Sequence, residues 1–248
     1  WIALAAACGA GVDAVTAASP LVNRREAARN GLKRAWFVQM GVDPARSEVS
    51  RWLLTTDRLY GVTTSGAAFA IETQTGSPLW IRQISPPGRA AFGPSANQDY
   101  VAVVSGSKLY LLDQHDGQTR WIRDLGSAPG AGPSLTDSYG FVAMVTGRIE
   151  GYKLNSPDAQ PWYYQSKGRA FSQPTATGKV ISWPTDQGYL YVALADGPRV
   201  LYRLETDGEI VASPAHMAPY LYVASLDGYL YCIDQISGAE AWRFSTGY

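Results

Sequence analysis

Tryptophan recurs along this chain with a fixed period, and no other feature of the sequence restricts the fold as strongly. Four indoles lie at Trp80, Trp121, Trp162 and Trp242; the first two intervals are 41 residues and the third, 80 residues, equals two periods of 40. Tyr202 occupies the skipped position. Self-similarity at this length predicts a repeat architecture in which each period is one structural unit.

Other residue types keep the same period. A glycine shortly precedes a pair made of a small or apolar residue and an aromatic one, and these pairs are Ala68-Phe69, Leu109-Tyr110, Gly151-Tyr152, Leu190-Tyr191 and Leu230-Tyr231. A small residue or Gln followed by proline recurs at Gly93-Pro94, Gly132-Pro133, Gln173-Pro174 and Ser213-Pro214. Because these markers are independent of the tryptophans, the probability that all of them share one period by chance is negligible.

Each period has the pattern of short β-strands. In the second one, the apolar run 100–104 ends at a Ser-Gly turn, a second run covers 109–112, and a third continues through Trp121. Short strands separated by turn residues indicate a sandwich, barrel or propeller, and a period near 40 selects four-stranded propeller blades. We therefore predict an all-β propeller with five blades, at approximately 51–92, 93–132, 133–172, 173–212 and 213–248.

The turn before each tryptophan has a physical rationale. Asp113 can accept backbone N–H groups in the turn, and Gly117 can take the positive φ that closes it. Asp234 and Gly238 repeat the pattern, whereas Pro157 and Ala159 degrade it in the third blade. A buried aromatic ring removes about 150–250 Å² from water, enough to fasten a blade to its neighbour. The expected structural anchors are Trp36, Trp80, Trp121, Trp162, Trp242, Asp113, Gly117, Asp234 and Gly238.

The N-terminal fifth of the sequence differs from the repeats. Residues 1–20 are apolar and small, which predicts the remnant of a signal peptide or lipoprotein leader. Cys8 is the candidate lipidation site, although Leu4 stands four residues before it rather than the three usual in a lipobox. Residues 21–50 predict a short helix, Val22–Arg29, and an outer strand, Lys33–Met40, that carries Trp36.

These N-terminal features predict export, with the protein in the periplasm or associated with the outer membrane of a bacterium. No apolar stretch is long enough for a membrane-spanning helix, so we expect membrane contact only through a lipid anchor.

The composition excludes several functional classes. Lys+Arg and Asp+Glu are both 21, and this balance argues against nucleic-acid binding. The two cysteines, Cys8 and Cys232, form no CxxC motif. His115 and His216 are the only histidines, and neither has an identifiable triad partner. We therefore predict no catalytic, cofactor-binding or metal-binding residues.

The last repeat carries a resemblance to a known family. The segment Leu230–Trp242, with Asp234, Gly238 and Trp242 at fixed spacing, resembles the PQQ-like propeller repeat of quinoproteins and of BamB-like scaffolds. The resemblance covers residues 51–248 and implies a ring of seven or eight blades, of which five are present here. A closed five-bladed ring remains the alternative.

The resemblance leaves the function open between two classes. One is a non-catalytic exported scaffold that binds protein or peptide partners. The alternative is a quinone- and calcium-dependent dehydrogenase with part of its site elsewhere. That family's enzymes have an adjacent cysteine pair, calcium ligands and a catalytic Asp, and none of these can be placed in this sequence. A third class, a sugar- or polymer-binding module, has no specific feature to support it.

Overall fold

The computed structural model describes residues 24–41, 47–86, 89 and 91–247. The chain divides into two compact units, Trp1–Phe37 and Val38–Tyr248. The first contains a short helix, α1 (Arg24–Arg29). Its end is capped because the Asn30 side-chain amide donates to the Glu26 carbonyl at 2.9 Å and Gly31 takes a φ of 69°. The predicted leader at 1–20, with Cys8, lies outside the described residues.

The predicted outer strand Lys33–Met40 is not present. Residues 32–40 have no regular secondary structure, and the first strand begins at Val49. Trp36 is half-buried within this irregular segment. An alternating apolar pattern shows that a segment is able to form a strand, but a strand requires a neighbour for its hydrogen bonds, which a local pattern does not supply.

The second unit consists of five four-stranded antiparallel sheets, each a propeller blade formed by consecutive strands. Blade 1 contains β1 (Val49–Leu54), β2 (Arg58–Thr63), β3 (Ala67–Glu72) and β4 (Pro78–Gln83), and blade 2 contains β5 (Ala91–Ala96), β6 (Tyr100–Ser105), β7 (Lys108–Asp113) and β8 (Thr119–Asp124). Blade 3 contains β9 (Ser134–Leu135), β10 (Tyr139–Ala143), β11 (Arg148–Lys153) and β12 (Trp162–Gln165). Blade 4 contains β13 (Thr175–Thr177), β14 (Val180–Pro184), β15 (Tyr189–Leu194) and β16 (Val200–Glu205), and blade 5 contains β17 (Ala215–Met217), β18 (Tyr220–Ala224), β19 (Tyr229–Asp234) and β20 (Glu240–Ser245).

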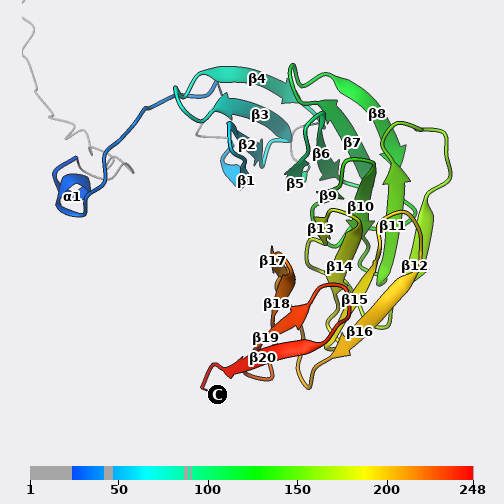
Figure 1. Cartoon of the computed structure of the whole chain (residues 1–248). Helices are drawn as coiled ribbons and strands as arrows, with labels where there is room; N and C mark the ends of the chain where they lie inside the picture. The colour runs from blue at the N-terminus through cyan, green and yellow to red at the C-terminus, as the bar shows by residue number, and fades with distance from the viewer. Residues whose placement is uncertain (1–23, 42–46, 87–88, 90, 248) are drawn as a thin grey trace, which may run out of the picture. The chain divides into compact units, whose positions relative to one another are not determined.

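The first strand of each blade is the innermost one. Contacts run in sequence from β1 to β5, β9, β13 and β17, and Figure 1 shows the blades following one another in chain order. β1 and β5 begin slightly before the predicted boundaries at 51 and 93. We call the end of the blades where the chain passes from one blade to the next the linker end, and the opposite end the far end.

The hydrophobic core lies between blades rather than within them. One cluster joins Tyr60 and Trp80 of blade 1 to Val101 and Leu112 of blade 2. Equivalent clusters fill the spaces between blades 2 and 3, 3 and 4, and 4 and 5. Each sheet therefore buries its apolar faces against its neighbours, as expected for a repeat whose single unit cannot enclose a core.

The strand register corrects one of the sequence markers. Opposite the outer strand, Phe69 faces Ile81 and Tyr110 faces Ile122, whereas in blade 3 it is Glu150 that faces Tyr163. The equivalent of the repeated aromatic residue is therefore Glu150 and not Tyr152. The pair Gly151-Tyr152 suggested a different alignment because the aromatic residue of this blade lies two positions after the equivalent one.

Candidate functional site

In blades 1 to 4, the repeated aromatic residue of the outer strand binds the far-end hairpin of the next blade. The indole N–H groups of Trp80, Trp121 and Trp162 donate to the backbone carbonyls of Gln114, Leu154 and Ala195 at 2.9, 2.9 and 3.1 Å. Tyr202, at the skipped position, uses its hydroxyl in the same way and donates to the Gln235 carbonyl at 3.0 Å. These bonds place Trp80, Trp121 and Trp162 at the joints between blades.

The hairpin that receives each aromatic ring depends on glycine. Gly117 and Gly238 have φ of 71° and 73°, and a Cβ on either would lie 2.6 Å from the ring of Trp80 or Tyr202. Trp242, on the outer strand of blade 5, is 46% exposed.

The aspartates of these hairpins hold the turns together. Asp113 accepts from the His115 amide at 2.7 Å and pairs with the Arg120 guanidinium, and Asp234 accepts from the Ile236 amide at 3.0 Å. Burial alone would raise the pKa of Asp113, but the hydrogen bonds and charge of Arg120 and the turn amides outweigh it and lower that pKa. Hydrogen bonds from Ser237 lower the pKa of Asp234. Both carboxylates are thus committed to structure.

A depression at the linker end draws on all five blades. It has a volume of about 340 Å³ and is lined where the chain enters the innermost strands. Phe92, Phe171 and Val211 on its rim are 38%, 50% and 55% exposed, and the exposed Arg51 is the charged residue of its lining. We call this depression the linker mouth. Arg169 stacks over Phe171 at 5.1 Å and pairs with Asp186 at 2.8 Å.

Hydrogen bonds between blades hold the floor of the linker mouth together. Gln173 donates its side-chain amide to the Pro133 carbonyl at 2.6 Å, and Ser172 donates to the Val211 carbonyl at 2.5 Å, so both bonds cross between blades. A Cβ on Gly132 would lie 2.6 Å from the backbone nitrogen of Gly93. Backbone packed this closely cannot accommodate a side chain, which explains the glycine that precedes Pro133.

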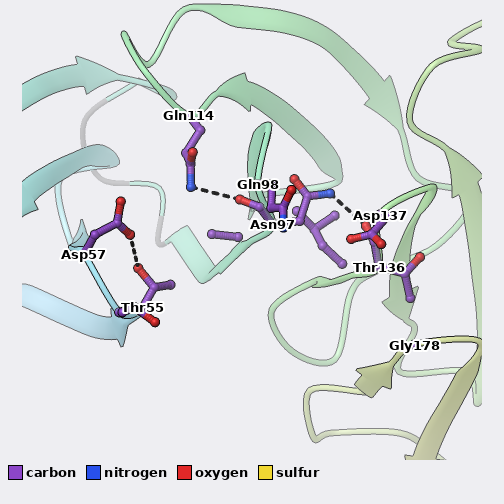
Figure 2. Close-up of a pocket in the computed structure, with 11 residues that line it drawn as sticks. Thr55, Asp57, Asn97, Gln98, Gln114, Thr136, Asp137 and Gly178 are labelled. Carbon is purple, nitrogen blue, oxygen red and sulfur yellow. Dashed lines mark hydrogen bonds between the residues drawn. The ribbon is translucent and has the colours of Figure 1, made fainter.

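A second depression lies at the far end, where the β1–β2, β5–β6 and β9–β10 loops meet (Figure 2). The Gln114 side chain donates to the Asn97 carbonyl at 2.9 Å, and the Asn97 amide donates to the Thr136 carbonyl at 2.8 Å. This chain of bonds joins the loops of blades 2 and 3. Asp57 and Asp137 lie on the rim and are exposed.

This depression continues into a neighbouring one between blades 3 and 4. The two have volumes of about 350 and 500 Å³ and share Thr136, Asp137 and Gly178 in their linings. The second adds Tyr139, Lys179, Leu194 and Asp196. We call the joined depressions the polar groove. Sequence reasoning identified neither it nor the linker mouth. Of the sequence features, only the recurring prolines pointed to the linker mouth, because the residues that precede them line it.

Within the described residues, no group of three or more His, Cys, Asp or Glu side chains is arranged to hold a metal ion. The His115 ring lies 3.4 Å from Arg58, and the His216 ring is 3.0 Å from the Gln235 amide. Cys232 is buried with a free thiol. No helix in the described ranges is long and apolar enough to span a membrane.

Repeated four-stranded blades joined by aromatic–carbonyl bonds define a β-propeller repeat protein of the PQQ-like type. The family model described as "Outer membrane protein assembly factor BamB" matches residues 105–247, which is more than half of the chain. The chain therefore belongs to the BamB-type family of PQQ-like repeat proteins.

Individual relatives agree with this assignment. The chain is 26% identical over 180 residues to outer membrane protein assembly factor BamB of Pseudomonas aeruginosa, covering 67% of this chain and 46% of the relative. The corresponding protein of Xanthomonas campestris pv. campestris is 26% identical over 174 residues, covering 66% and 42%. The chain thus spans less than half the length of these relatives.

Solved structures show the same fold. BamB from Moraxella catarrhalis superposes with a TM-score of 0.66 at 19% identity, covering 80% of this chain and 63% of that one. The Cps50 β-propeller domain of Myceliophteria thermophila superposes with a TM-score of 0.64 at 14% identity, covering 79% and 72%. The similarity of two such different proteins concerns the propeller itself. Both sequence relatives are outer membrane protein assembly factors.

Proposed function

We propose that this protein is a non-catalytic scaffold in outer-membrane protein assembly, and that a partner protein docks at the linker mouth. The observation that carries the proposal is the mouth itself, a depression that is joined by hydrogen bonds between blades and has three exposed apolar side chains on its rim, Phe92, Phe171 and Val211. Exposed aromatic and Arg side chains around a preformed depression are the usual anchors of a protein interface. The family match supports the process, outer-membrane protein assembly.

The rest of the proposal concerns location. The relatives are outer membrane protein assembly factors. Their role supports a location in the periplasm or at the outer membrane of a bacterium for this protein. Export and lipidation of Cys8 stay predictions. Fractionation of cells that express the full-length protein would test the location, and recovery of that protein in the cytosolic fraction would contradict it.

Site-specific photocrosslinking tests the docking surface. We would place a photoreactive phenylalanine analogue at Phe171 in the full-length protein, expressed in a bacterium, and identify crosslinked proteins by mass spectrometry. The matched control is the same analogue at Tyr163 on the outer strand of blade 3, which is 54% exposed and therefore comparable to Phe171 at 50%. We expect a protein of the outer-membrane assembly machinery to crosslink at position 171 and not at 163. Equal yields at both positions, or none at 171, would contradict the proposal.

A further inference from the structure

The far end of the propeller has a different character from the linker mouth. Its connections carry the acidic residues Asp57, Asp99, Asp116, Asp137, Asp158 and Asp196, whereas their basic residues are Lys179 and Arg199. Three of these carboxylates, Asp57, Asp137 and Asp196, line the polar groove, and Lys179 is the one basic residue of its lining. The groove therefore offers an excess of negative charge to a ligand.

The groove carboxylates differ from the turn-capping carboxylates Asp113, Asp116 and Asp234 in what they contact. Asp116, outside the groove, accepts from the Gln118 amide at 2.8 Å, just as Asp113 and Asp234 cap their own turns. In the part of the chain that the structure describes, the side chains of Asp137 and Asp196 take part in no hydrogen bond or ion pair. Asp57 has only long contacts, to Thr55 at 3.5 Å and to Arg58 at 3.7 Å. The fold does not need these three charges for its turns.

The shape of the groove favours a chain over a small compact ligand. It consists of two joined depressions that pass over the loops of four blades, from Asp57 in blade 1 to Asp196 in blade 4. At their junction lies Gly178, whose Cβ position has open space within 4 Å. Beyond the junction, Tyr139 and Leu194 add apolar wall. An extended segment can place cationic side chains beside the carboxylates and an apolar one beside Tyr139.

We propose that the polar groove binds an extended Lys- or Arg-bearing peptide segment of a second partner protein. Complementary charge across an interface gives specificity and speeds association, and exposed carboxylates contribute these effects at little desolvation cost. Because the linker mouth lies at the other end of the blades, the propeller would bridge two partners. This inference goes beyond the scaffold function and does not depend on which protein occupies the mouth.

Peptide binding to the full-length protein tests the proposal. The probe is a fluorescein-labelled twelve-residue peptide in which Lys and Arg alternate with Leu, Ser and Gly, and its counterpart has Glu at every basic position. Fluorescence anisotropy measures both affinities. We expect only the cationic peptide to bind, and raising the salt from 50 to 300 mM to weaken it by about fivefold or more, since exposed charges are screened.

Variants locate the binding. Replacing Asp57, Asp137 and Asp196 by Asn should weaken the cationic peptide by about tenfold or more. Gly178→Asn should also weaken it, because it fills the junction while Asn tolerates the φ of 57°. The matched control, Asp158→Asn with Asp207→Asn and Glu209→Gln, changes the net charge equally outside the groove and should leave the affinity unchanged.

Three outcomes would overturn the proposal: no binding of the cationic peptide, equal binding of the acidic peptide, or an equal loss in the control triple variant. Thermal unfolding of each variant shows whether it is folded. The crosslink at Phe171 is read independently, so the scaffold function and the groove can fail separately.

Discussion

The junction between blades 1 and 2 and the junction between blades 2 and 3 use the same indole–carbonyl bond in different surroundings. At the first, Trp80 is 5% exposed, lies against Gly117 and shares the Gln114 carbonyl with Arg58 at 2.5 Å. At the second, Trp121 is only half-buried, and the β11–β12 hairpin that accepts its hydrogen bond lacks the Asp–Gly turn.

The second junction instead buries a carboxylate. Glu150 is 2% exposed, accepts a hydrogen bond from the Tyr152 hydroxyl and pairs with Arg148 at 2.8 Å. Burial, together with the hydrogen bond and charge of Glu150, raises the pKa of Tyr152, so that this hydroxyl remains the donor. The comparison shows that one repeat position can be filled by an aromatic ring or by a buried carboxylate that forms an ion pair. The loss of stability on removing the side chain has a different cause in the two cases. Removing an aromatic ring leaves a cavity, whereas removing one member of a polar pair leaves the other without a partner.

The largest effect is expected from Trp80→Ala. Loss of a buried indole from a packed junction costs about 3–5 kcal/mol of unfolding free energy, as for other large-to-small core substitutions. The control is Tyr163→Ala, on the outer strand of blade 3 and 54% exposed, which should cost less than about 1 kcal/mol. Denaturant unfolding followed by fluorescence measures both. Similar losses would show that the buried contact with Gly117 is not what fastens blades 1 and 2.

A smaller loss is expected from Glu150→Ala. It leaves the Tyr152 hydroxyl and the Arg148 guanidinium without their partner, at a cost of about 2–3 kcal/mol. The Arg148 side chain is 36% exposed, so water replaces part of the lost contact. Glu150→Gln retains an acceptor and should cost about half as much. If Glu150→Ala were as stable as the wild type by denaturant unfolding, the polar junction would not be a stabilising element.

The smallest effect concerns pH. The pKa of Asp113 is lowered in the folded state. Its contribution to stability is therefore present above the unfolded value of about 3.9 and is lost as the pH falls through the folded value. The hairpin of blade 3 has Leu154-Asn155 at this place and no such group. Asp113→Asn should reduce the stability lost between pH 7 and pH 3, whereas Asn155→Ala should leave that difference unchanged. An unaltered pH dependence in Asp113→Asn would contradict this account.

The repeat could be predicted because each marker reports a local requirement that recurs in every blade. A turn that needs positive φ selects glycine, as at Gly117, and an outer strand that must bind its neighbour selects a large aromatic residue with a donor, as at Trp121 or Tyr202. The candidate sites escaped this reasoning because the proline markers show where each blade begins, but not which side chains line a site. Phe171 and Asp137 have neighbours that come from other blades, and no local pattern shows that these neighbours lie beside them.

The sequence by itself determined the all-β class, the four-stranded blades and their anchoring by aromatic rings, because period, turn chemistry and β-pattern are properties of short segments. The tertiary structure alone decided that Glu150 replaces an aromatic residue, that residues 33–40 form no strand, and that loops of separate blades create the linker mouth and the polar groove. These features depend on strand pairing and on the stacking of one blade against the next. Such contacts join residues about 40 positions apart, beyond the range over which local patterns carry information.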